Sequence, residues 1–329
     1  MGKPKIYIAL PESDANLKWE DRQFLREFAE VIQHSGKQKP TDEEKLMICR
    51  DVDGVVIGRS GGWLTREMID AAKKLKVVGV IGGSVVGAQP DYLLNKGIAV
   101  INTGWAMSPA VAEFTLAMML CGLRDIPHMI SSMQQKGWGT ARNALDLTGK
   151  TVGLIGFGMI ARRVAELLKP FQNDIRVFDP YVAPEKITGY DVCLCGLDEL
   201  LSQSLVVSIH AGLTDETQGM IGAHQLAFIP DGGLLVNTAR AGVVDEKALI
   251  AELKTGRIRA ALNVFWTEPL SIDHPLRSFD NVILTPHGGG LTQDTMLRHS
   301  RSIARDLKKF FAGEDVQNLV SREMLERMT

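Results

Sequence analysis

The sequence of 329 residues has little cysteine, and its cysteines lack the spacing that binds zinc. The four cysteines form no C-x-x-C or C-x-x-H pair, and Cys193 and Cys195 stand too close together for a routine structural disulfide. These absences argue against a metal centre and against a disulfide-stapled secreted scaffold. We therefore expect no metal site, and we expect the cysteines, which also include Cys49 and Cys121, to be buried thiols in a reducing compartment.

An excess of one charge is also lacking, because 37 basic residues stand against 39 acidic ones, for a formal net charge of −2. Without a basic surplus, nucleic acid is not expected as a partner. The most apolar stretch, residues 111–123, contains Glu113 and is too short to span a bilayer, so it predicts a buried helix. Residues 1–14 read as a strand and a polar turn rather than as a signal peptide. We expect a cytoplasmic protein with no membrane partner.

The sequence does contain a repeated alternation of short apolar segments with segments of helical periodicity. Strands are predicted at residues 5–10, 54–58, 76–81, 98–102, 151–156, 174–179, 205–210, 232–239, 260–265 and 281–286. Helices are predicted at residues 19–33, 65–75, 90–97, 108–124, 159–169, 218–229, 245–256 and 292–313. This alternation is typical of parallel sheets, and the chain length favours two domains.

The stretch TVGLIGFGMIA, residues 151–161, places a G-x-G-x-x-A motif between a predicted strand and a predicted helix. By itself the motif also fits an ordinary strand-to-helix turn. Its context favours a dinucleotide site: Gly156 permits the tight turn, Gly158 lets backbone N–H groups approach a pyrophosphate, and Ala161 lets the helix pack closely. Asp179 ends the next strand, at the spacing where a carboxylate meets the ribose hydroxyls of NAD and repels the 2′-phosphate of NADP.

Three polar residues follow successive predicted strands near their carboxyl ends: Arg240, Glu268 and His287. Taken singly, each has an ordinary interpretation, as a surface charge, a loop carboxylate and a structural histidine. In an open α/β sheet, however, ligands bind at the carboxyl edge of the strands. Together at one edge, beside a dinucleotide turn, the three residues predict a cation for a carboxylate substrate and a histidine–carboxylate pair for proton transfer.

Three long segments carry a resemblance to a known family: residues 153–180, 235–270 and 281–290. They resemble the D-isomer specific 2-hydroxyacid dehydrogenases, NAD-dependent enzymes that interconvert 2-keto acids and D-2-hydroxy acids. The likeness extends from about Val55 to Asn318 and includes LKVVGVIGG, KGIAVINTG and AVAEFTLAMML. The chain is therefore identified as a member of this family by several motifs in the right order.

The resemblance implies an α/β fold with two Rossmann-like, doubly wound parallel-sheet domains and a cleft between them. The cofactor domain would be inserted in the substrate domain. Residues 1–104 and 291–329 would form the substrate-binding domain, and residues 105–290 the NAD-binding domain. The resemblance further implies a homodimer and a small-molecule 2-keto or 2-hydroxy acid as substrate.

The resemblance also implies roles for individual residues. His287 matches the general acid/base, Glu268 its paired carboxylate, and Arg240 the arginine that binds the substrate carboxylate. Hydride would pass between C4 of nicotinamide and C2 of the substrate. Substrate contacts are implied for Arg240, His287, Ser60, Gly82, Gly83 and Ser84. Cofactor contacts are implied for Gly156, Phe157, Gly158, Met159, Ile160, Asp179, Pro180, His210, Ala211, Gly212, Thr214, Thr238, Ala239, Arg240, Asn263, His287 and Gly289.

Two positions depart from the family pattern, with Asn263 where aspartate is usual and Gly212 where proline is frequent. Asparagine retains a side-chain oxygen that can accept a hydrogen bond from the nicotinamide amide. Because Asp179 would repel the 2′-phosphate of NADP, NAD is expected as the cofactor and NADP is disfavoured. The alternative to a dehydrogenase is an NAD(H)-responsive binding protein of the corepressor type with little or no turnover, since such proteins can retain all three polar residues.

Overall fold

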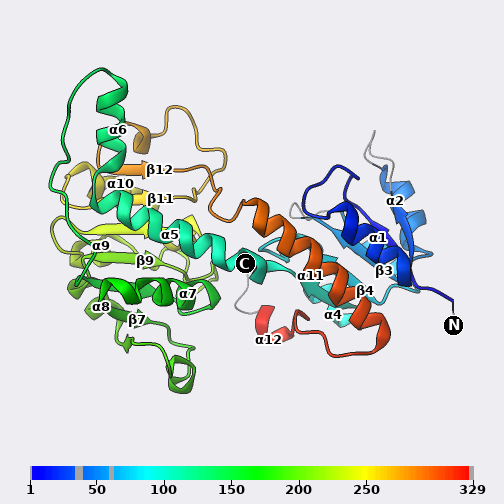
Figure 1. The fold of residues 1–329 in the computed structure, drawn as a ribbon. Helices are drawn as coiled ribbons and strands as arrows, with labels where there is room; N and C mark the ends of the chain where they lie inside the picture. Colours follow the sequence, from blue (N-terminus) through cyan, green and yellow to red (C-terminus); the bar gives the residue numbers. More distant parts are fainter. Residues whose placement is uncertain (1, 34–39, 59–62, 326–329) are drawn as a thin grey trace. The chain divides into compact units, whose positions relative to one another are not determined.

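A computed structural model describes residues 2–33, 40–58 and 63–325, which fold into two units, each built on one parallel sheet (Figure 1). The first unit comprises Met1–Met107 and Leu291–Thr329, and the second comprises Ser108–Gly290. The chain leaves the first unit after Met107, where a boundary after residue 104 was expected, and it returns after Gly290.

The first unit contains a five-stranded sheet with the order β2-β1-β3-β4-β5. Every neighbouring pair of strands is parallel. The strands are β1 (Lys5–Ile8), β2 (Glu30–Gln33), β3 (Gly54–Ile57), β4 (Val77–Val80) and β5 (Ala99–Asn102). The helices are α1 (Trp19–Phe28), α2 (Asp42–Cys49), α3 (Arg66–Ala71), α4 (Pro90–Asn95), α11 (Gln293–Ala312) and α12 (Arg322–Leu325), with short 3-10 helices at Val86–Ala88 and Gly104–Met107.

Two apolar clusters cover the two faces of this sheet. On one face α1 and α11 pack through side chains such as Leu25, Ile303 and Leu307. On the other face α2, α3 and α4 pack against Val55 and Val78. Alternation of side chains along a strand explains the division, since Ile6 and Ile8 point to the α11 face while Tyr7 points to the other.

The predicted helix over residues 19–33 was wrong in its last third. The helix ends at Phe28, Ala29 is extended, and β2 then pairs with β1 in parallel, with Lys5 opposite Glu30. The β-branched side chains of Val31 and Ile32 favour the strand, and the pairing supplies backbone hydrogen bonds that local periodicity does not reveal.

The second unit contains a seven-stranded parallel sheet with the order β12-β11-β10-β9-β6-β7-β8. The strands are β6 (Thr151–Ile155), β7 (Asp174–Phe178), β8 (Cys193–Leu194), β9 (Val206–Ile209), β10 (Leu234–Asn237), β11 (Arg259–Leu262) and β12 (Val282–Leu284). The helices are α5 (Ser108–Leu123), α6 (Ile126–Gln134), α7 (Met159–Leu168), α8 (Leu197–Gln203), α9 (Ala223–Phe228) and α10 (Glu246–Lys254), with 3-10 helices at Lys169–Phe171, Pro184–Ile187, Ala241–Val243 and Pro275–Ser278.

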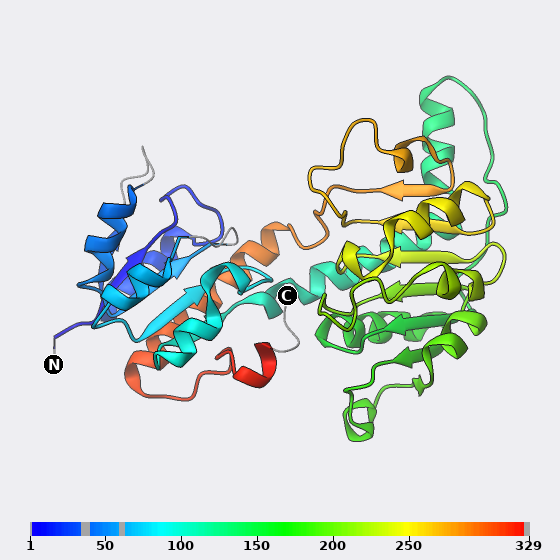
Figure 2. The ribbon, with the colours of Figure 1, turned by 180° about the vertical axis from the view of Figure 1, so that it is seen from behind.

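Helices cover both faces of the second sheet. α5 and α7 pack on one face, where Met119 and Val164 join Leu154 of β6. α8, α9 and α10 cover the other face, which is turned toward the viewer in Figure 2. The apolar pattern predicted neither the strand β8 nor the helices α6 and α8. This doubly wound arrangement confirms the predicted α/β class with parallel sheets.

The apolar stretch that was expected to form a buried helix does so in the structure. The stretch Gly104–Leu123 is long and apolar enough to cross a membrane by length and composition, but half of it is buried, and α5 packs against α7 and β10 as a core helix does.

The four cysteines are free, as expected, but Cys49 alone of them is buried, while Cys193 is exposed and Cys121 and Cys195 are intermediate. The expectation of four buried thiols was therefore wrong.

Candidate active site

The first feature of the site is the crossover point of the seven-stranded sheet. From β6 the chain runs outward to β7 and β8 and then returns to β9 on the other side of β6. In such sheets the loops after the two central strands diverge and leave a ligand crevice at the carboxyl edge. Gly156 begins the loop after β6 with φ +86°, and a Cβ there would lie 2.8 Å from the backbone N of Ala211 in the loop after β9. The close approach of these loops therefore requires glycine at this position.

The amino terminus of α7 provides an anion site beside that turn. Gly158 caps the helix without a side-chain hydrogen bond, and a Cβ built on it meets no atom within 4 Å. The first backbone N–H groups of an α-helix, here including those of Met159 and Ile160, have no partner within the helix and lie where the helix dipole is positive. Ala161 is fully buried in the apolar core, as close helix packing demands. This geometry fits a pyrophosphate.

Asp179 is fixed against the glycine turn from the end of β7. Its Oδ2 accepts a hydrogen bond of 2.7 Å from the N–H of Phe157, and its Oδ1 accepts one of 2.9 Å from the N–H of Tyr181. The Tyr181 hydroxyl donates to Glu216 in the loop after β9. Glu216 is a second carboxylate that the sequence pattern did not indicate, and Tyr181 links it to the loop that carries Asp179. Pro180 lies between Asp179 and Tyr181 and is exposed.

The loop after β9 carries the predicted residues His210, Ala211, Gly212 and Thr214. Burial lowers the pKa of His210 to about 4, so the ring is neutral at pH 7, and its Nε2 lies 3.0 Å from the hydroxyl of Ser208. The Thr217 hydroxyl donates to the carbonyl oxygen of Gly212 at 2.7 Å and accepts from the N–H of Thr214 at 2.8 Å. Thr217 therefore shapes this loop.

The candidate acid/base pair is formed between the ends of β11 and β12. Nδ1 of His287 lies 2.7 Å from Oε2 of Glu268, and Oε1 of Glu268 accepts a 3.0 Å hydrogen bond from the N–H of Phe265. Partial burial acts to raise the pKa of the Glu268 carboxyl, but the bonds from His287 and Phe265 and the charges of His287 and Arg240 together hold it below the ordinary value. Glu268 is therefore ionised at neutral pH.

His287 adopts an uncommon backbone conformation. Its φ is +39°, in the left-handed region that is unfavourable for a non-glycine residue. Its N–H donates to the carbonyl oxygen of Asn263 at 2.8 Å and to that of Thr285 at 3.0 Å. The surrounding hydrogen bonds thus compensate for the strain and aim the imidazole at Glu268.

Arg240 stands three residues after the end of β10 and belongs to the same edge. Its Nη1 donates to the carbonyl oxygen of Ala239 at 2.9 Å, and its charge is near enough to Glu268 to lower the pKa of that carboxyl. Thr238 is 8% exposed, and its hydroxyl lies 2.8 Å from that of Thr115 on α5, so this side chain is engaged within the unit. Gly289 is buried against Phe114 and the Oδ1 of Asn263.

The predicted substrate loop lies in the first unit, after β4. Gly82 has φ +139°, and its N–H donates to the hydroxyl of Thr103 at 3.4 Å. Gly83 is exposed, and the hydroxyl of Ser84 accepts a hydrogen bond from the N–H of Val86. Exposed backbone of this kind can donate to a carboxylate. The predicted contact Ser60 lies outside the described residues.

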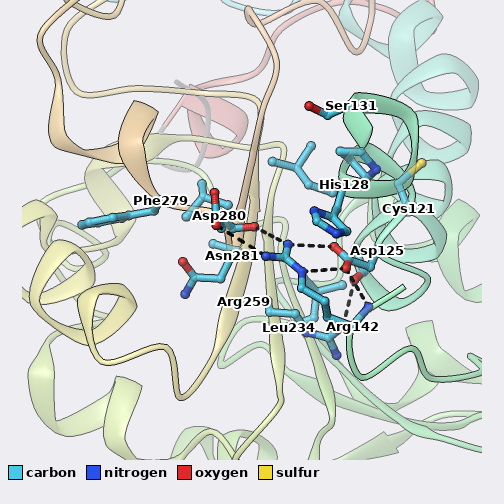
Figure 3. Close-up of a pocket in the computed structure, with 15 residues that line it drawn as sticks. Cys121, Asp125, His128, Ser131, Arg142, Leu234, Arg259, Phe279, Asp280 and Asn281 are labelled. Carbon is cyan, nitrogen blue, oxygen red and sulfur yellow. Dashed lines mark hydrogen bonds and ion pairs between the residues drawn. The ribbon is translucent and has the colours of Figure 1, made fainter. Parts of the chain in front are cut away.

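A cavity of about 220 Å³ lies at the opposite, amino edge of the second sheet, between α6 and the starts of β10, β11 and β12 (Figure 3). Arg142 crosses it, with Nε 3.0 Å from Asp125 Oδ2 and Nη1 3.5 Å from Asp280 Oδ2. None of the predicted site residues lines it. We interpret this charge network as a structural tie between the segment after α6 and the sheet.

Comparisons with known proteins agree with this geometry. A sequence model described as "D-isomer specific 2-hydroxyacid dehydrogenase, NAD binding domain" matches residues 116–289, more than half of the chain. A D-3-phosphoglycerate dehydrogenase of Methanocaldococcus jannaschii is 38% identical over 320 residues, which are 96% of this chain and 59% of that protein. A glyoxylate reductase of Thermofilum pendens is 34% identical over 336 residues, covering 99% of this chain and 97% of that protein. The chain thus spans about three fifths of the M. jannaschii relative and nearly all of the T. pendens one.

Solved structures show the same fold. A glyoxylate reductase from Paecilomyes thermophila superposes with a TM-score of 0.85 at 25% identity, covering 98% of this chain and 100% of that one. A D-mandelate dehydrogenase of Rhodotorula graminis superposes with a TM-score of 0.87 at 22% identity, covering 98% of both chains, and supports the fold alone. The chain belongs to the D-isomer specific 2-hydroxyacid dehydrogenase family, and its second unit is an NAD-binding domain of that family.

Proposed function

We propose that the protein oxidises a small D-2-hydroxy acid to the 2-keto acid, or catalyses the reverse reduction, with His287 as general acid/base, Glu268 as its partner and Arg240 as the substrate-binding cation. The observation that carries the proposal is the 2.7 Å contact between His287 and Glu268 at the strand edge that also bears Arg240 and the dinucleotide turn.

The contact with Glu268 determines which nitrogen of His287 handles the proton. Nδ1 is engaged by the carboxylate, so Nε2 is left for the substrate oxygen. The ionised Glu268 accepts from Nδ1–H and so fixes the orientation of the ring. Nε2–H then donates to the keto oxygen during reduction, and neutral Nε2 accepts the hydroxyl proton during oxidation.

Arg240 supplies the cation for the substrate carboxylate. Its guanidinium is planar and permanently charged, and it can hold a carboxylate through two parallel hydrogen bonds. Its Nη1 bond to Ala239 fixes one side of the group from within its own turn. Orientation of the reacting carbon is the main contribution expected from this residue.

The cofactor fits the residues at the crossover point. The N–H groups after Gly158 would hold the pyrophosphate, and Asp179 would accept from a ribose hydroxyl. NAD, when bound, supplies the hydride acceptor or donor. Asp179 and Glu216 disfavour the 2′-phosphate of NADP.

The substrate is proposed to be a short 2-keto acid. Relatives carry the names D-3-phosphoglycerate dehydrogenase and glyoxylate reductase, and the latter matches this chain over nearly its whole length. The backbone of Gly82, Gly83 and Ser84 would donate to the carboxylate from the first unit, which acts as the substrate-binding domain in this proposal.

The test is NADH consumption with a panel of glyoxylate, hydroxypyruvate and longer 2-keto acids, followed by the absorbance of the reduced nicotinamide. Turnover with one member of the panel, and its loss in His287→Ala with NADH binding retained, is the expected result. No turnover with any member, together with tight NADH binding, would contradict the enzymatic proposal and favour the corepressor-type binding role.

We further propose that the protein is a cytoplasmic homodimer. Residues of α6 are all at least partly exposed, and its large apolar side chains Ile130 and Met133 are each 53% exposed. Trp138, in the segment that follows α6, is 84% exposed. Apolar side chains of this size that face water mark an interaction surface, and a second copy of the chain would cover them. Ile130→Glu should then shift the protein to the monomer in sedimentation velocity, and an unchanged sedimentation coefficient would contradict this interface.

A further inference from the structure

Three strands end in an asparagine whose side chain is buried. Asn102 is the last residue of β5, Asn237 is the last residue of β10, and Asn263 follows the last residue of β11. They are 8%, 2% and 2% exposed, respectively. A buried amide must satisfy both its oxygen and its nitrogen, so the partners of these side chains define what they hold.

Asn237 holds the turn that carries Arg240. Its Oδ1 accepts a 3.1 Å hydrogen bond from the N–H of Ala239, and its Nδ2 donates at 2.9 Å to the carbonyl oxygen of Arg240. The side chain thereby clamps the backbone on both sides of the peptide bond that precedes Arg240. The direction in which the guanidinium leaves the strand end is set by this clamp.

Asn263 holds the segment that carries His287. Its backbone oxygen accepts from the N–H of His287 at 2.8 Å. Its Oδ1 accepts from the N–H of Gly289 at 3.3 Å, and its Nδ2 donates to the hydroxyl of Thr285 at 2.9 Å. Asn263 therefore forms hydrogen bonds before, at and after His287, the residue with the strained backbone conformation.

Asn102 repeats the arrangement in the first unit. Its Nδ2 donates at 3.0 Å to the carbonyl oxygen of Gly82, and its Oδ1 accepts at 2.9 Å from the N–H of Gly104. The loop that it holds begins at Gly82, where φ is +139°, and continues into the backbone proposed to bind the substrate carboxylate.

We propose that Asn102, Asn237 and Asn263 are positioning residues, each fixing the backbone of a loop that carries a group of the reaction. The inference rests on the proposed function for the roles of the loops. An amide suits the task because it presents a donor and an acceptor without a charge, whereas an ionised aspartate presents acceptors alone.

The acceptor that each Nδ2 faces decides whether aspartate can replace asparagine. Nδ2 of Asn237 faces a backbone carbonyl, which cannot become a donor. Nδ2 of Asn263 lies 2.9 Å from the Thr285 hydroxyl, which can rotate to donate to a carboxylate. It also lies 3.4 Å from the Thr285 carbonyl oxygen, but that oxygen accepts from the N–H of His287 at 3.0 Å and stays satisfied without Asn263. That hydroxyl now donates to the carbonyl oxygen of Leu262 at 3.1 Å, but the same oxygen also accepts from the N–H of Thr285 at 3.0 Å and would stay satisfied.

The experiment compares the same substitution at both positions. Asn237→Asp should raise KM for the 2-keto acid and lower kcat/KM about tenfold to a hundredfold, because Arg240 loses its direction. Asn263→Asp places a carboxylate at a position implied to contact the nicotinamide, so this variant serves as the reference for the one that follows and is not compared with the unsubstituted protein. Adding Thr285→Val to Asn263→Asp removes the rotatable donor and should lower kcat about tenfold or more below that of Asn263→Asp alone, with KM for the 2-keto acid nearly unchanged.

Asn281→Asp is the matched control. Nδ2 of Asn281 donates to the carbonyl oxygens of Leu253 and Ile258 at the opposite edge of the same sheet. This variant loses equivalent hydrogen bonds and should lower the melting temperature without changing KM or kcat. An Asn237→Asp protein with unchanged kinetics, a double variant with the same kcat as Asn263→Asp, or a kinetic defect in Asn281→Asp would each overturn the inference.

Failure of the proposed function is separable from failure of this inference. An unsubstituted protein without turnover would refute the function. The positioning role is then read from crystal structures of the two aspartate variants. Asn237→Asp should displace the backbone of residues 239–241, while Asn263→Asp should leave residues 285–289 in place. The opposite pattern, or displacement in neither, would refute the positioning role.

Discussion

Replacement of Glu268 by glutamine tests the acid/base pair with a side chain of the same shape. The carboxylate now accepts from two donors, the N–H of Phe265 through Oε1 and Nδ1 of His287 through Oε2. Glutamine has one acceptor oxygen, so it can serve one of these donors while its NH₂ faces the other. The pair therefore loses a hydrogen bond and the negative charge beside the imidazole.

Loss of the Glu268 charge is expected to have a small effect on stability and a large one on catalysis. The side chains of His287 and Glu268 are 39% and 37% exposed. At their 2.7 Å separation, Coulomb attraction in a water-like dielectric is worth about 1.5 kcal/mol, and the ordering of both side chains brings the net contribution below about 1 kcal/mol. Loss of the charge that orients a general acid/base costs far more in rate, about 10²- to 10⁴-fold in kcat.

The assay is steady-state reduction of the best 2-keto acid, with thermal unfolding measured on the same samples. We expect Glu268→Gln to lose kcat by the stated factor while its melting temperature changes little. The Glu268 pKa lies below its ordinary value of 4.5, so the carboxylate stabilises the fold above that pH and loses this contribution as the pH falls through the folded-state pKa. The melting temperatures of the two proteins should therefore converge in acid. Retention of wild-type kcat would refute the role of the pair.

Three further substitutions test the other parts of the site. His287→Ala should remove most turnover while NADH binding, measured by fluorescence titration, remains nearly intact; unchanged turnover would refute its assignment. Asp179→Ala should weaken NADH binding and narrow the preference over NADPH, and an unaltered ratio of the two dissociation constants would count against its role. Gly156→Ala should lower the free energy of unfolding by about 2–4 kcal/mol, because φ is +86° and the new Cβ would meet the Ala211 backbone at 2.8 Å. Full stability in urea titration would contradict that geometry.

The sequence predicted those features of the fold that local patterns encode. Buried parallel strands are short apolar runs, and so β6, β9 and β10 were predicted close to their observed bounds. The segment after Phe28 was misassigned because the pairing of β2 with β1 is a tertiary interaction that outweighs helical periodicity. Short elements such as β8 lack enough residues to show any period.

The candidate site was predictable at the level of strand ends and not at the level of contacts. Arg240, Glu268 and His287 were proposed from the sequence because a polar residue soon after an apolar run is a visible signal. Glu216 was missed, because its contact with Tyr181 joins two loops far apart in the sequence. The holding roles of Asn237 and Asn263 are also invisible in sequence, since an asparagine after a strand equally predicts a turn.

The interrupted first unit has a consequence for synthesis of the chain. α11, which covers one face of the five-stranded sheet through Ile303 and Leu307, lies beyond the whole second unit in the sequence. Residues 108–290 are contiguous and can complete their fold as they leave the ribosome. Until α11 has been synthesised, the apolar face of the five-stranded sheet, which includes Val56 and Val77, lacks the side chains of Ile303 and Leu307. We therefore expect the nascent chain to bind chaperones most strongly before α11 leaves the ribosome.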